Sequence, residues 1–404
     1  MIQDISHASP PRVALASGSL ALGGVTTFLC NLGGDLVRRK IPVEVLNFEL
    51  DNPMAADFQR LNVPVLCQDH HRLIFEDRLA AVLRELSRFQ PTVVVANLSS
   101  TSFEVLRYLP AGVFRVGVGQ SDHPTTYELM RHYAPWMDLA AMVSQTMRQK
   151  AAAMPEFARV PVAYLSYGVP MPLAADLPVR DWSAPLRILY LGRLVVGQKR
   201  VHLFPEILSQ LCASGMPFHW TIAGDGEERA FLEASMKPVS PNQTVSIIGP
   251  IQYADVPALL KLHDICLLTS DHEGFGLSVL EAMGYGLVPV VSDLPAGIPE
   301  MVDKTTGILV PVDDVAGYAR AIIHLHEHRE ELAAKSAAAR ERVKTKFSIE
   351  AMTDGWLAAF PPTTAPISDW PQQWSITAPL VARHPVYFSP PLRVLRRLAA
   401  KFRR

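Results

Sequence analysis

The sequence has few cysteines, no long uncharged hydrophobic run and almost no net charge. Its four cysteines lie far apart without a Cys-x-x-Cys pair, which argues against a disulfide scaffold, a zinc ribbon or an iron–sulfur site. No stretch of about 18 apolar residues lacks a charge or a helix breaker, so a membrane-spanning helix is not expected. A formal charge of −1 over 404 residues excludes a globally basic nucleic-acid-binding protein.

The small net charge conceals an uneven distribution. Residues 393–404 contain six arginines and lysines and no acid, so the other 392 residues carry a formal charge of −7. Along 392–404 the leucines, an alanine and Phe402 follow a helical period on one side, and the cations occupy the other side. This pattern predicts an amphipathic helix that binds an anionic membrane surface. A helix packed on the acidic body of the protein, or a frayed tail, is the alternative.

The rest of the sequence alternates short β-rich runs with helical periodicity, which predicts a doubly wound α/β architecture. Many of the runs are continuously apolar, as is typical of parallel strands covered on both faces. The expected strands are Val13–Ser17, Val43–Phe48, Val63–Cys67, Thr92–Asn97, Phe114–Val118, Leu139–Val143, Val162–Leu165, Leu186–Leu191, His219–Ala223, Val245–Ile248, Ile265–Thr269, Val288–Ser292 and Ile308–Val310. Helices are expected at Thr26–Arg39, Leu79–Arg88, His202–Ala213 and Val256–His263, and from about Val315 to Phe347.

Two such sheets are expected, joined near Pro170–Pro185, where four prolines and a loss of periodicity indicate a linker. We therefore predict Rossmann-like domains over 1–175 and 183–347 that face a cleft. Residues 348–404 are expected to hold a crossover, a proline-rich arm and the basic helix. The arm has eight prolines between 361 and 391, too many for a helix or a central strand.

The most informative stretch, SDHEGFGLSVLEAMGYG, follows the expected strand Ile265–Thr269. Ligands of open α/β sheets bind beyond the carboxyl ends of strands. Glu273 lies in this loop, and Gly274 and Gly276 permit close approach of a ligand to the backbone. A helix begins near Gly276, and its free amides suit a phosphate. Glu281, in the second turn, would accept hydrogen bonds from ribose hydroxyls.

Two cations follow another expected strand, Leu186–Leu191. Gly192 and Arg193 come directly after it, and Lys199 lies a few residues further. Positive side chains at a neighbouring strand exit stabilise charge on a diphosphate leaving group, above all in a dry cleft. A third loop, GDGEE beginning at Gly224, lacks the third glycine of a dinucleotide fingerprint, and its acids oppose a pyrophosphate.

Together these motifs resemble those of the retaining GT-B glycosyltransferases of family 4, the glycosyl transferases group 1. The similarity covers residues 187–347 and extends to the loop at Gly23 and Gly24. It implies that Arg193 and Lys199 contact the diphosphate of a nucleotide-sugar donor, while Glu273 contacts the sugar. The implied donor-binding set is Gly23, Gly24, Gly192, Arg193, Lys199, Gly224, Gly274, Phe275, Gly276, Leu277 and, on the ribose, Glu281.

The resemblance also implies that the first domain binds the acceptor and that one of its histidines approaches the donor sugar. His123, in the loop after Phe114–Val118, is the candidate, and Asp122 is the alternative. The surrounding residues depart from the commoner family pattern. Asn97 and Ser99 are expected on the acceptor side. The implied catalytic set is His123, Glu273, Arg193 and Lys199.

The function implied is transfer of a hexosyl group from a UDP- or GDP-sugar to a lipid-linked or polysaccharide acceptor, with retention at the anomeric carbon. No cofactor or metal is expected, because Arg and Lys fill the cation role and the sequence has no Asp-x-Asp motif. A sugar-nucleotide epimerase of the same fold and a catalytically silent nucleotide-sugar-binding protein are the alternatives. The expected location is cytoplasmic, peripheral on the inner membrane through 392–404, with no nucleic-acid partner.

Two other patterns receive simpler interpretations. His324 and His328 have metal-ligand spacing without an evident third ligand, so a solvated helix face is expected there. The apolar run Val13–Cys30 is interrupted by Gly18 and by the Gly23 loop, which favours strand, loop and helix over a signal peptide.

Overall fold

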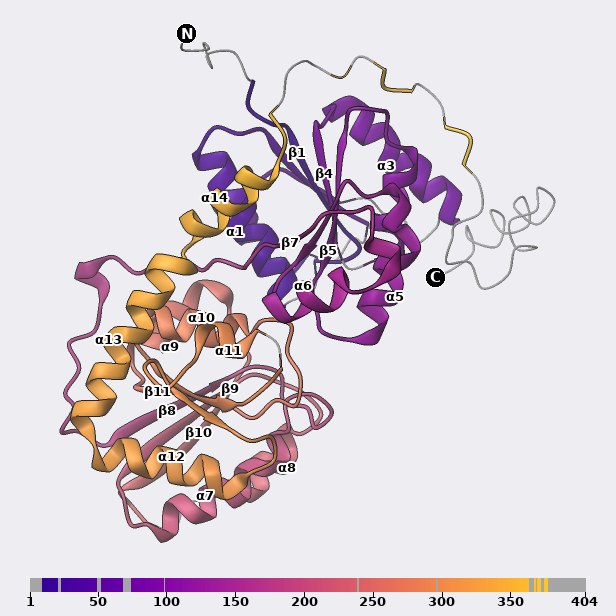
Figure 1. The fold of residues 1–404 in the computed structure, drawn as a ribbon. Coiled ribbons are helices and arrows are strands. Elements are labelled where there is room, and N and C mark those ends of the chain that lie inside the picture. Colours follow the sequence, from indigo (N-terminus) through magenta and orange to yellow (C-terminus); the bar gives the residue numbers. More distant parts are fainter. Residues whose placement is uncertain are drawn as a thin grey trace. The chain divides into compact units, whose positions relative to one another are not determined.

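The computed structural model describes residues 9–20, 23–48, 52–67, 74–97, 99–237, 240–295, 297–362, 367, 369–371 and 374–376. The chain forms two compact units, here called the first and the second unit (Figure 1). The first comprises the described residues of Met1–Val143, Met147–Ser166 and Met352–Arg404. The second comprises Ser144–Thr146 and the described residues of Tyr167–Ala351. The predicted basic helix at 392–404 and most of the predicted proline-rich arm lie outside the described residues.

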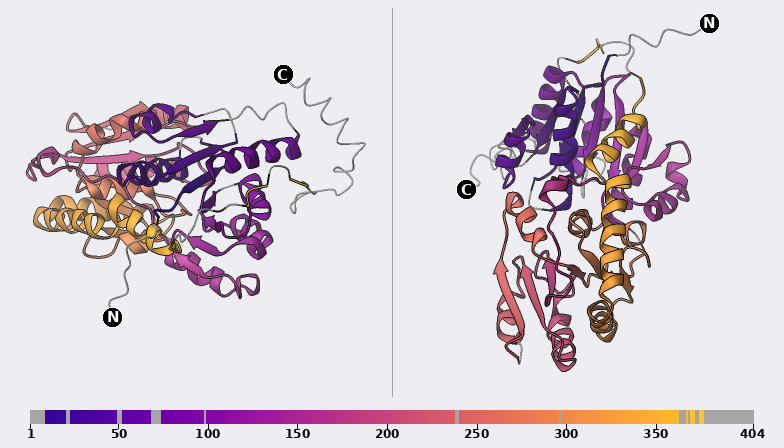
Figure 2. Two further views of the ribbon diagram at one scale, coloured as in Figure 1. Left: turned by 90° about the horizontal axis from the view of Figure 1, so that it is seen from above. Right: turned by 90° about the vertical axis from the view of Figure 1, so that its left-hand side faces the viewer.

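The first unit contains a seven-stranded parallel sheet with the order β3-β2-β1-β4-β5-β6-β7. Helices line both of its faces (Figures 1 and 2). The strands are β1 (Val13–Ser17), β2 (Val43–Asn47), β3 (Val65–Cys67), β4 (Val93–Asn97), β5 (Phe114–Gly119), β6 (Leu139–Met142) and β7 (Val162–Tyr164). The helices along these segments are α1 (Gly24–Arg38), α2 (Ala55–Arg60), α3 (Phe75–Phe89), α4 (Ser100–Val105), α5 (Pro124–Tyr133), α6 (Gln145–Ala152) and α14 (Ile349–Ala359).

The fully buried strand β1 is central to the first unit and pairs with both β2 and β4. The chain thus winds outward from β1 in one direction and from β4 in the other. Helix α14 returns to this unit and packs beside α1 (Figure 1). There the rings of Trp356 and Phe28 lie 5.4 Å apart, and Arg39 Nη1 donates to Asp354 Oδ1 at 2.5 Å.

The second unit contains a six-stranded parallel sheet with the order β10-β9-β8-β11-β12-β13. Its strands are β8 (Leu186–Leu191), β9 (Phe218–Ala223), β10 (Gln243–Gly249), β11 (Ile265–Leu268), β12 (Val288–Ser292) and β13 (Ile308–Val310). Its helices are α7 (Phe204–Ala213), α8 (Arg229–Ser235), α9 (Val256–Lys261), α10 (Leu277–Gly284), α11 (Ile298–Met301), α12 (Val315–Glu327) and α13 (Arg329–Lys346).

The predicted fold class, two doubly wound α/β sheets, is confirmed. Each expected strand is present, with ends displaced by no more than two residues. The predicted helical run from Val315 to Phe347 is divided into α12 and α13, because the backbone of His328 leaves the helical region with φ −117° and ψ 67°. Asp314 begins α12 by accepting a hydrogen bond at 2.8 Å from the N–H of Gly317, as an N-cap residue does.

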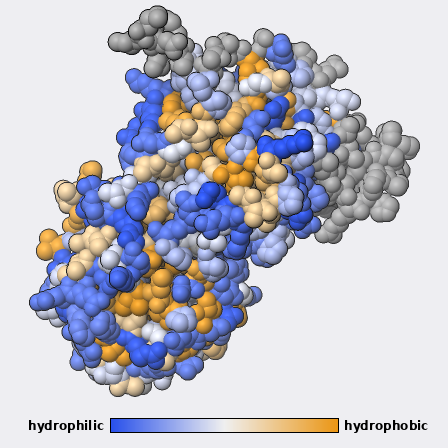
Figure 3. Space-filling view, in the orientation of Figure 1, coloured by the Kyte–Doolittle hydropathy of each residue, from blue (hydrophilic) through white to orange (hydrophobic). Residues whose placement is uncertain are grey.

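The visible surface carries separate hydrophobic patches on each unit rather than one continuous apolar face (Figure 3). In the second unit the most exposed large hydrophobic side chains include Leu173, Val179 and Leu262. Of the helices in the described part of the chain, none combines the length and hydrophobicity needed to cross a bilayer.

Candidate functional site

The predicted donor-site residues of the second unit follow two adjacent strands, β8 and β11. These strands pair through Ile188 and Ile265, and the direction of winding reverses between them. Open α/β sheets bind ligands at the carboxyl side of such a reversal. Arg193 follows β8 and Glu273 follows β11, so the strand order points to the same position as the motifs.

Lys199 and Glu273 form an ion pair at this position. The Nζ of Lys199 lies 2.5 Å from Oε1 of Glu273, and the two side chains are only 13% and 9% exposed. The hydroxyl of Ser270 donates to the same carboxylate oxygen at 2.6 Å, and the hydroxyl of Thr269 donates to the carbonyl of Lys199 at 2.7 Å. Because solvent screens a mostly buried pair weakly, its charges act strongly on a nearby ligand.

Arg193 is held by a side chain from its own loop. Its Nη2 donates to Oε1 of Gln198 at 2.6 Å, and its carbonyl accepts a hydrogen bond from the Tyr190 hydroxyl at 2.6 Å. The Nε2 of Gln198 donates to the carbonyl of His272 at 3.1 Å. Gln198 therefore joins the loop of Arg193 to the loop that follows β11.

Gly224 lies directly against the backbone of Gly192. Its φ is +146°, and a Cβ at this position would lie 1.8 Å from the carbonyl oxygen of Gly192. The N–H of Gly224 donates to the carbonyl of Gly249 at 2.7 Å. Backbone packing beside Arg193 therefore requires glycine at position 224.

Replacement of Gly224 by alanine is expected to displace the backbone of Gly192 and, if the predicted donor binds here, to weaken its binding about tenfold or more, since the cation beside it moves. Isothermal titration calorimetry with UDP and GDP measures this effect. Gly215→Ala is the matched control, because Gly215 also has a positive φ, +75°, but no atom lies within 4 Å of its Cβ position. Equal affinity in Gly224→Ala and wild type would contradict this role of the glycine.

After Glu273, the loop before α10 contributes backbone amides to the site. Gly274 and Gly276 flank Phe275, whose ring is buried between Tyr167 and Phe347 at centroid distances of 5.6 and 5.5 Å. Gly276 has φ +97°, and among the described residues no side chain caps the helix that begins at Leu277. The first amides of α10 thus remain suited to an anion.

Glu281 lies in the second turn of α10. Within the part of the chain that the structure describes, no hydrogen-bond or ion-pair partner accompanies its carboxylate. Burial raises the pKa of Glu281 to about 7, because desolvation disfavours the ionised form. Donors from a ligand would favour ionisation, so this carboxylate suits a ligand that brings hydroxyl groups.

The raised pKa of Glu281 predicts that the second unit loses stability as the pH rises from about 4.5 to about 7. The carboxyl ionises near pH 4.5 in the unfolded chain but near 7 in the folded unit, so the free energy of unfolding falls across this interval. Thermal unfolding of wild type and Glu281→Gln across that range tests it. Stability of the variant should fall less, and identical pH profiles would contradict the shifted pKa.

His123 lies in the first unit, at the start of α5. Its Nδ1 accepts a hydrogen bond from the N–H of Thr125 at 3.3 Å and lies 2.8 Å from the hydroxyl oxygen of the same residue, so Nε2 is left for other contacts. Asp122, the alternative, accepts hydrogen bonds from the Tyr127 hydroxyl and from Nζ of Lys150, each at 2.6 Å. Asp122 therefore joins this loop to α5 and α6.

The other predicted residues of the first unit lie near the carboxyl ends of β1 and β4. Oδ1 of Asn97 accepts a hydrogen bond from Nε2 of Gln120 at 2.6 Å, and Ser99 caps α4. Gly23 and Gly24 form the start of α1, with open space where a side chain would extend from Gly23. Their contact with a donor stays a prediction, as does that of His123.

Gln198, Thr269 and Ser270 were not among the predicted site residues. The available signal was weak: hydroxyl residues directly after a buried strand at the reversal of the sheet, and an amide residue beside Lys199. The partners of Gln198 and Thr269 across the site, His272 and Lys199, lie 74 and 70 residues away along the chain, which motif spacing cannot show.

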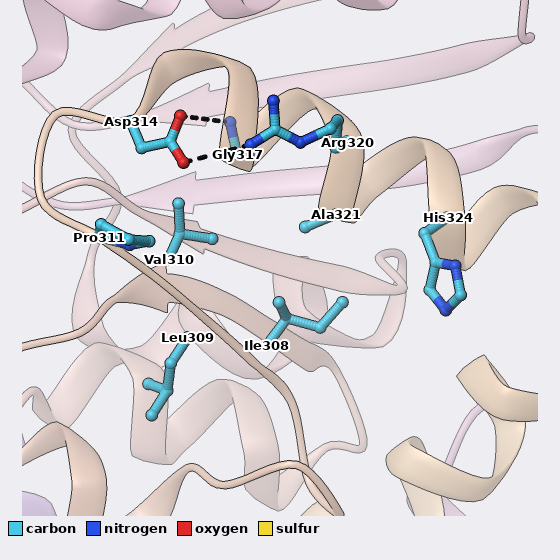
Figure 4. A pocket seen from close by; sticks show the side chains of 9 residues that line it. All are labelled: Ile308, Leu309, Val310, Pro311, Asp314, Gly317, Arg320, Ala321 and His324. Carbon is cyan, nitrogen blue, oxygen red and sulfur yellow. Dashed lines mark hydrogen bonds and ion pairs between the residues drawn. The ribbon is translucent and has the colours of Figure 1, made fainter.

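A separate concavity of about 370 Å³ lies between β13 and α12 (Figure 4). Its lining includes Ile308, Val310, Arg320 and His324, and it contains none of the predicted site residues. Nε2 of His324 lies 2.8 Å from a carboxylate oxygen of Glu331. The ring of His324 stacks on the ring of His328, with the ring centroids 4.1 Å apart. No cluster of three or more metal-ligating side chains occurs among the described residues.

Comparison with known proteins relates the chain to sugar-transferring enzymes. Residues 185–328 match the family described as Glycosyl transferases group 1. WcaL of Escherichia coli (strain K12), named as a candidate colanic acid biosynthesis glycosyltransferase, is 27% identical over 310 residues, or 72% of this chain and 75% of WcaL.

Two solved structures share the fold. A mutant of S. aureus TarM, in complex with fondaparinux, alpha-GlcNAc-glycerol and UDP, superposes with a TM-score of 0.71 at 13% identity, over 86% of this chain and 99% of TarM. Anabaena HepE in complex with UDP superposes with a TM-score of 0.69 at 18% identity, over 86% of this chain and 98% of HepE.

Proposed function

We propose that this chain, whose residues 185–328 match the family described as Glycosyl transferases group 1 and whose fold is GT-B, transfers a hexosyl group from a UDP- or GDP-sugar, with retention at the anomeric carbon. The observation that carries the proposal is the position of Arg193 after β8 and of the Lys199–Glu273 ion pair at the carboxyl ends of β8 and β11, with Glu281 in the helix that follows β11. Two cations, two carboxylates and a helix start match a ligand that has a diphosphate and many hydroxyls.

The cations act on the leaving group. As the bond to the sugar breaks, negative charge develops on the diphosphate, and Arg193, Lys199 and the first amides of α10 stabilise it. These groups are held in place by Gln198 and the buried hydroxyl of Thr269, so little reorganisation accompanies the reaction. They fill the cation role, so the proposal includes no metal ion.

The carboxylates recognise hydroxyl groups. Glu281 accepts hydrogen bonds from the ribose and Glu273 from the sugar, since ionised carboxylates are strong acceptors. His123 would offer its Nε2–H to the sugar near the reacting carbon. The acceptor hydroxyl then attacks from the face that the diphosphate leaves, and a leaving phosphate oxygen takes its proton.

The proposed acceptor is a polysaccharide or a lipid-linked glycan. The name of WcaL refers to colanic acid, and the TarM complex contains alpha-GlcNAc-glycerol, which supports a glycan or glycoside acceptor. Both structural neighbours contain UDP, which supports a nucleoside diphosphate in the donor.

The proposed place of action is the cytoplasmic face of the membrane, with residues 392–404 as the contact. The support is the basic amphipathic sequence pattern. Deletion of 390–404 is expected to release the protein from anionic liposomes at low salt, as measured by sedimentation with the vesicles. Liposome binding that persists after the deletion would contradict the proposed membrane contact through these residues.

A thermal-shift screen over UDP, GDP and their sugars tests the donor, because a ligand of the folded state raises its stability as occupancy grows. Product analysis with the donor found in this way then tests the reaction. Sugar attached to an acceptor is the expected result. An epimerised donor without transfer, or binding without turnover, would replace the proposal with one of the two alternatives.

A further inference from the structure

Two side chains assigned to different parts of the donor are bonded to each other in the structure. Lys199, proposed for the diphosphate, pairs with Glu273, proposed for the sugar. Both side chains are mostly buried, so neither charge is well screened by water. A diphosphate that approaches Lys199 therefore meets a carboxylate already bound there.

The carboxylate and the diphosphate oppose each other at this lysine. Both are negative, and two like charges held at one ammonium group repel strongly where the effective dielectric constant is low. Lys199 can therefore bind a diphosphate tightly only if its ion pair with Glu273 weakens.

The surrounding contacts let the side-chain ends exchange while the backbones stay in place. Thr269 holds the carbonyl of Lys199, and Ser270 holds Oε1 of Glu273, through hydroxyls at the end of β11. Both hydroxyl residues are fully buried. When the carboxylate leaves Lys199, the bond from Ser270 keeps it close to the site.

We propose that Glu273 is an exchangeable counter-ion that discriminates the nucleotide-sugar donor from the nucleoside-diphosphate product. This inference rests on the proposed function. The donor supplies sugar hydroxyls that bind the carboxylate once the diphosphate has taken Lys199. After transfer the diphosphate carries no sugar, so the carboxylate returns to Lys199 and weakens the hold on the product.

Titration of UDP and GDP into wild type and Glu273→Gln tests the exchange. Removal of the competing charge is expected to tighten binding of the nucleoside diphosphate about tenfold, although the same substitution lowers sugar transfer. Glu273→Ala, measured in parallel, should shift the affinity in the same direction. A merely structural role of Glu273 predicts weaker binding instead.

Two controls separate the exchange from other effects. Glu341→Gln removes the same charge on an exposed part of α13 and should leave the affinity unchanged. In a Lys199→Met background, Glu273→Gln should no longer tighten binding, because the competition is for that lysine.

Unchanged or weaker binding by both Glu273 variants, with wild type still binding, would overturn the exchange and leave the donor site intact. Absence of UDP and GDP binding in wild type and in every variant would overturn the proposed function and the exchange together.

Discussion

Replacement of Lys199 by methionine is expected to lower the rate of sugar transfer by about 100- to 1,000-fold. Methionine keeps much of the length and the apolar stem of lysine but removes the ammonium group that stabilises the leaving diphosphate. Losses of this size are typical when a preorganised group that stabilises developing charge is removed. The hydroxyl of Ser270 still holds Glu273 in the variant, so the loop after β11 is expected to remain folded.

Initial rates of UDP or GDP release from the donor, with the acceptor present, measure this effect. The loss should appear mainly in kcat, because the charge on the diphosphate grows in the transition state. Lys346→Met is the control for loss of a lysine, since Lys346 is exposed in the last turn of α13. A kcat of Lys199→Met within about fivefold of the wild-type kcat would contradict the role of this lysine.

Replacement of Asp264 by alanine is expected to destabilise the second unit by about 3–5 kcal/mol. Asp264 is 5% exposed and accepts hydrogen bonds from two guanidinium groups, Arg180 Nη1 at 2.9 Å and Arg187 Nη2 at 2.8 Å. Arg180 is itself only 6% exposed, so removal of the carboxylate leaves a buried cation without its counter-charge. Burial lowers the pKa of Arg180, and the loss of Asp264 would remove the negative charge and the hydrogen bond that oppose this lowering.

The ion pair of Arg180 with Asp264 also fixes the segment that was predicted as a linker. Within residues 170–185 the structure has a short 3-10 turn at Ala174–Asp176, and Arg180 binds the segment to Asp264 at the start of β11. Four prolines and a loss of periodicity had predicted a linker here. The sequence offers no sign of the arginine's partner, which lies 84 residues away.

Denaturant unfolding followed by tryptophan fluorescence measures this effect, and the transition that the substitution moves is expected to be that of the second unit, which contains Trp182 and Trp220. Asp176→Ala is a matched control, because Asp176 joins the same segment to Lys261 at 3.4 Å but is 54% exposed. Exposed pairs contribute less than about 1 kcal/mol, so this control should change stability little. Similar effects of the two substitutions would contradict the importance of burial.

The strands were predictable because burial on both faces gives each of them a continuous apolar run. β1, with its five buried residues, is the clearest example. The ends were less accurate where polar residues continue a strand, as at Gln243 in β10. The break at His328 between α12 and α13 was not expected, since a change in one backbone conformation leaves little trace in hydrophobic periodicity.

The candidate site could be predicted from the sequence where polar and charged residues directly follow a strand. Arg193 follows β8 and Glu273 follows β11, so strand order predicts that their loops are neighbours, and Glu281 lies in the helix after the second loop. The ion pair of Lys199 with Glu273 was not foreseen, because it depends on how two loops approach each other. The close packing of Gly224 on the backbone of Gly192 was not foreseen either, for the same reason.

The most direct test of the central claim is the anomeric configuration of the transferred sugar, read by proton NMR from the product of the purified enzyme, its donor and a glycan acceptor. We predict a hexosyl group joined to the acceptor with the configuration that it had in the nucleotide sugar, and about 100- to 1,000-fold less of this product in the same time from Lys199→Met. A product of inverted configuration, or wild-type amounts of product from the variant, would contradict it.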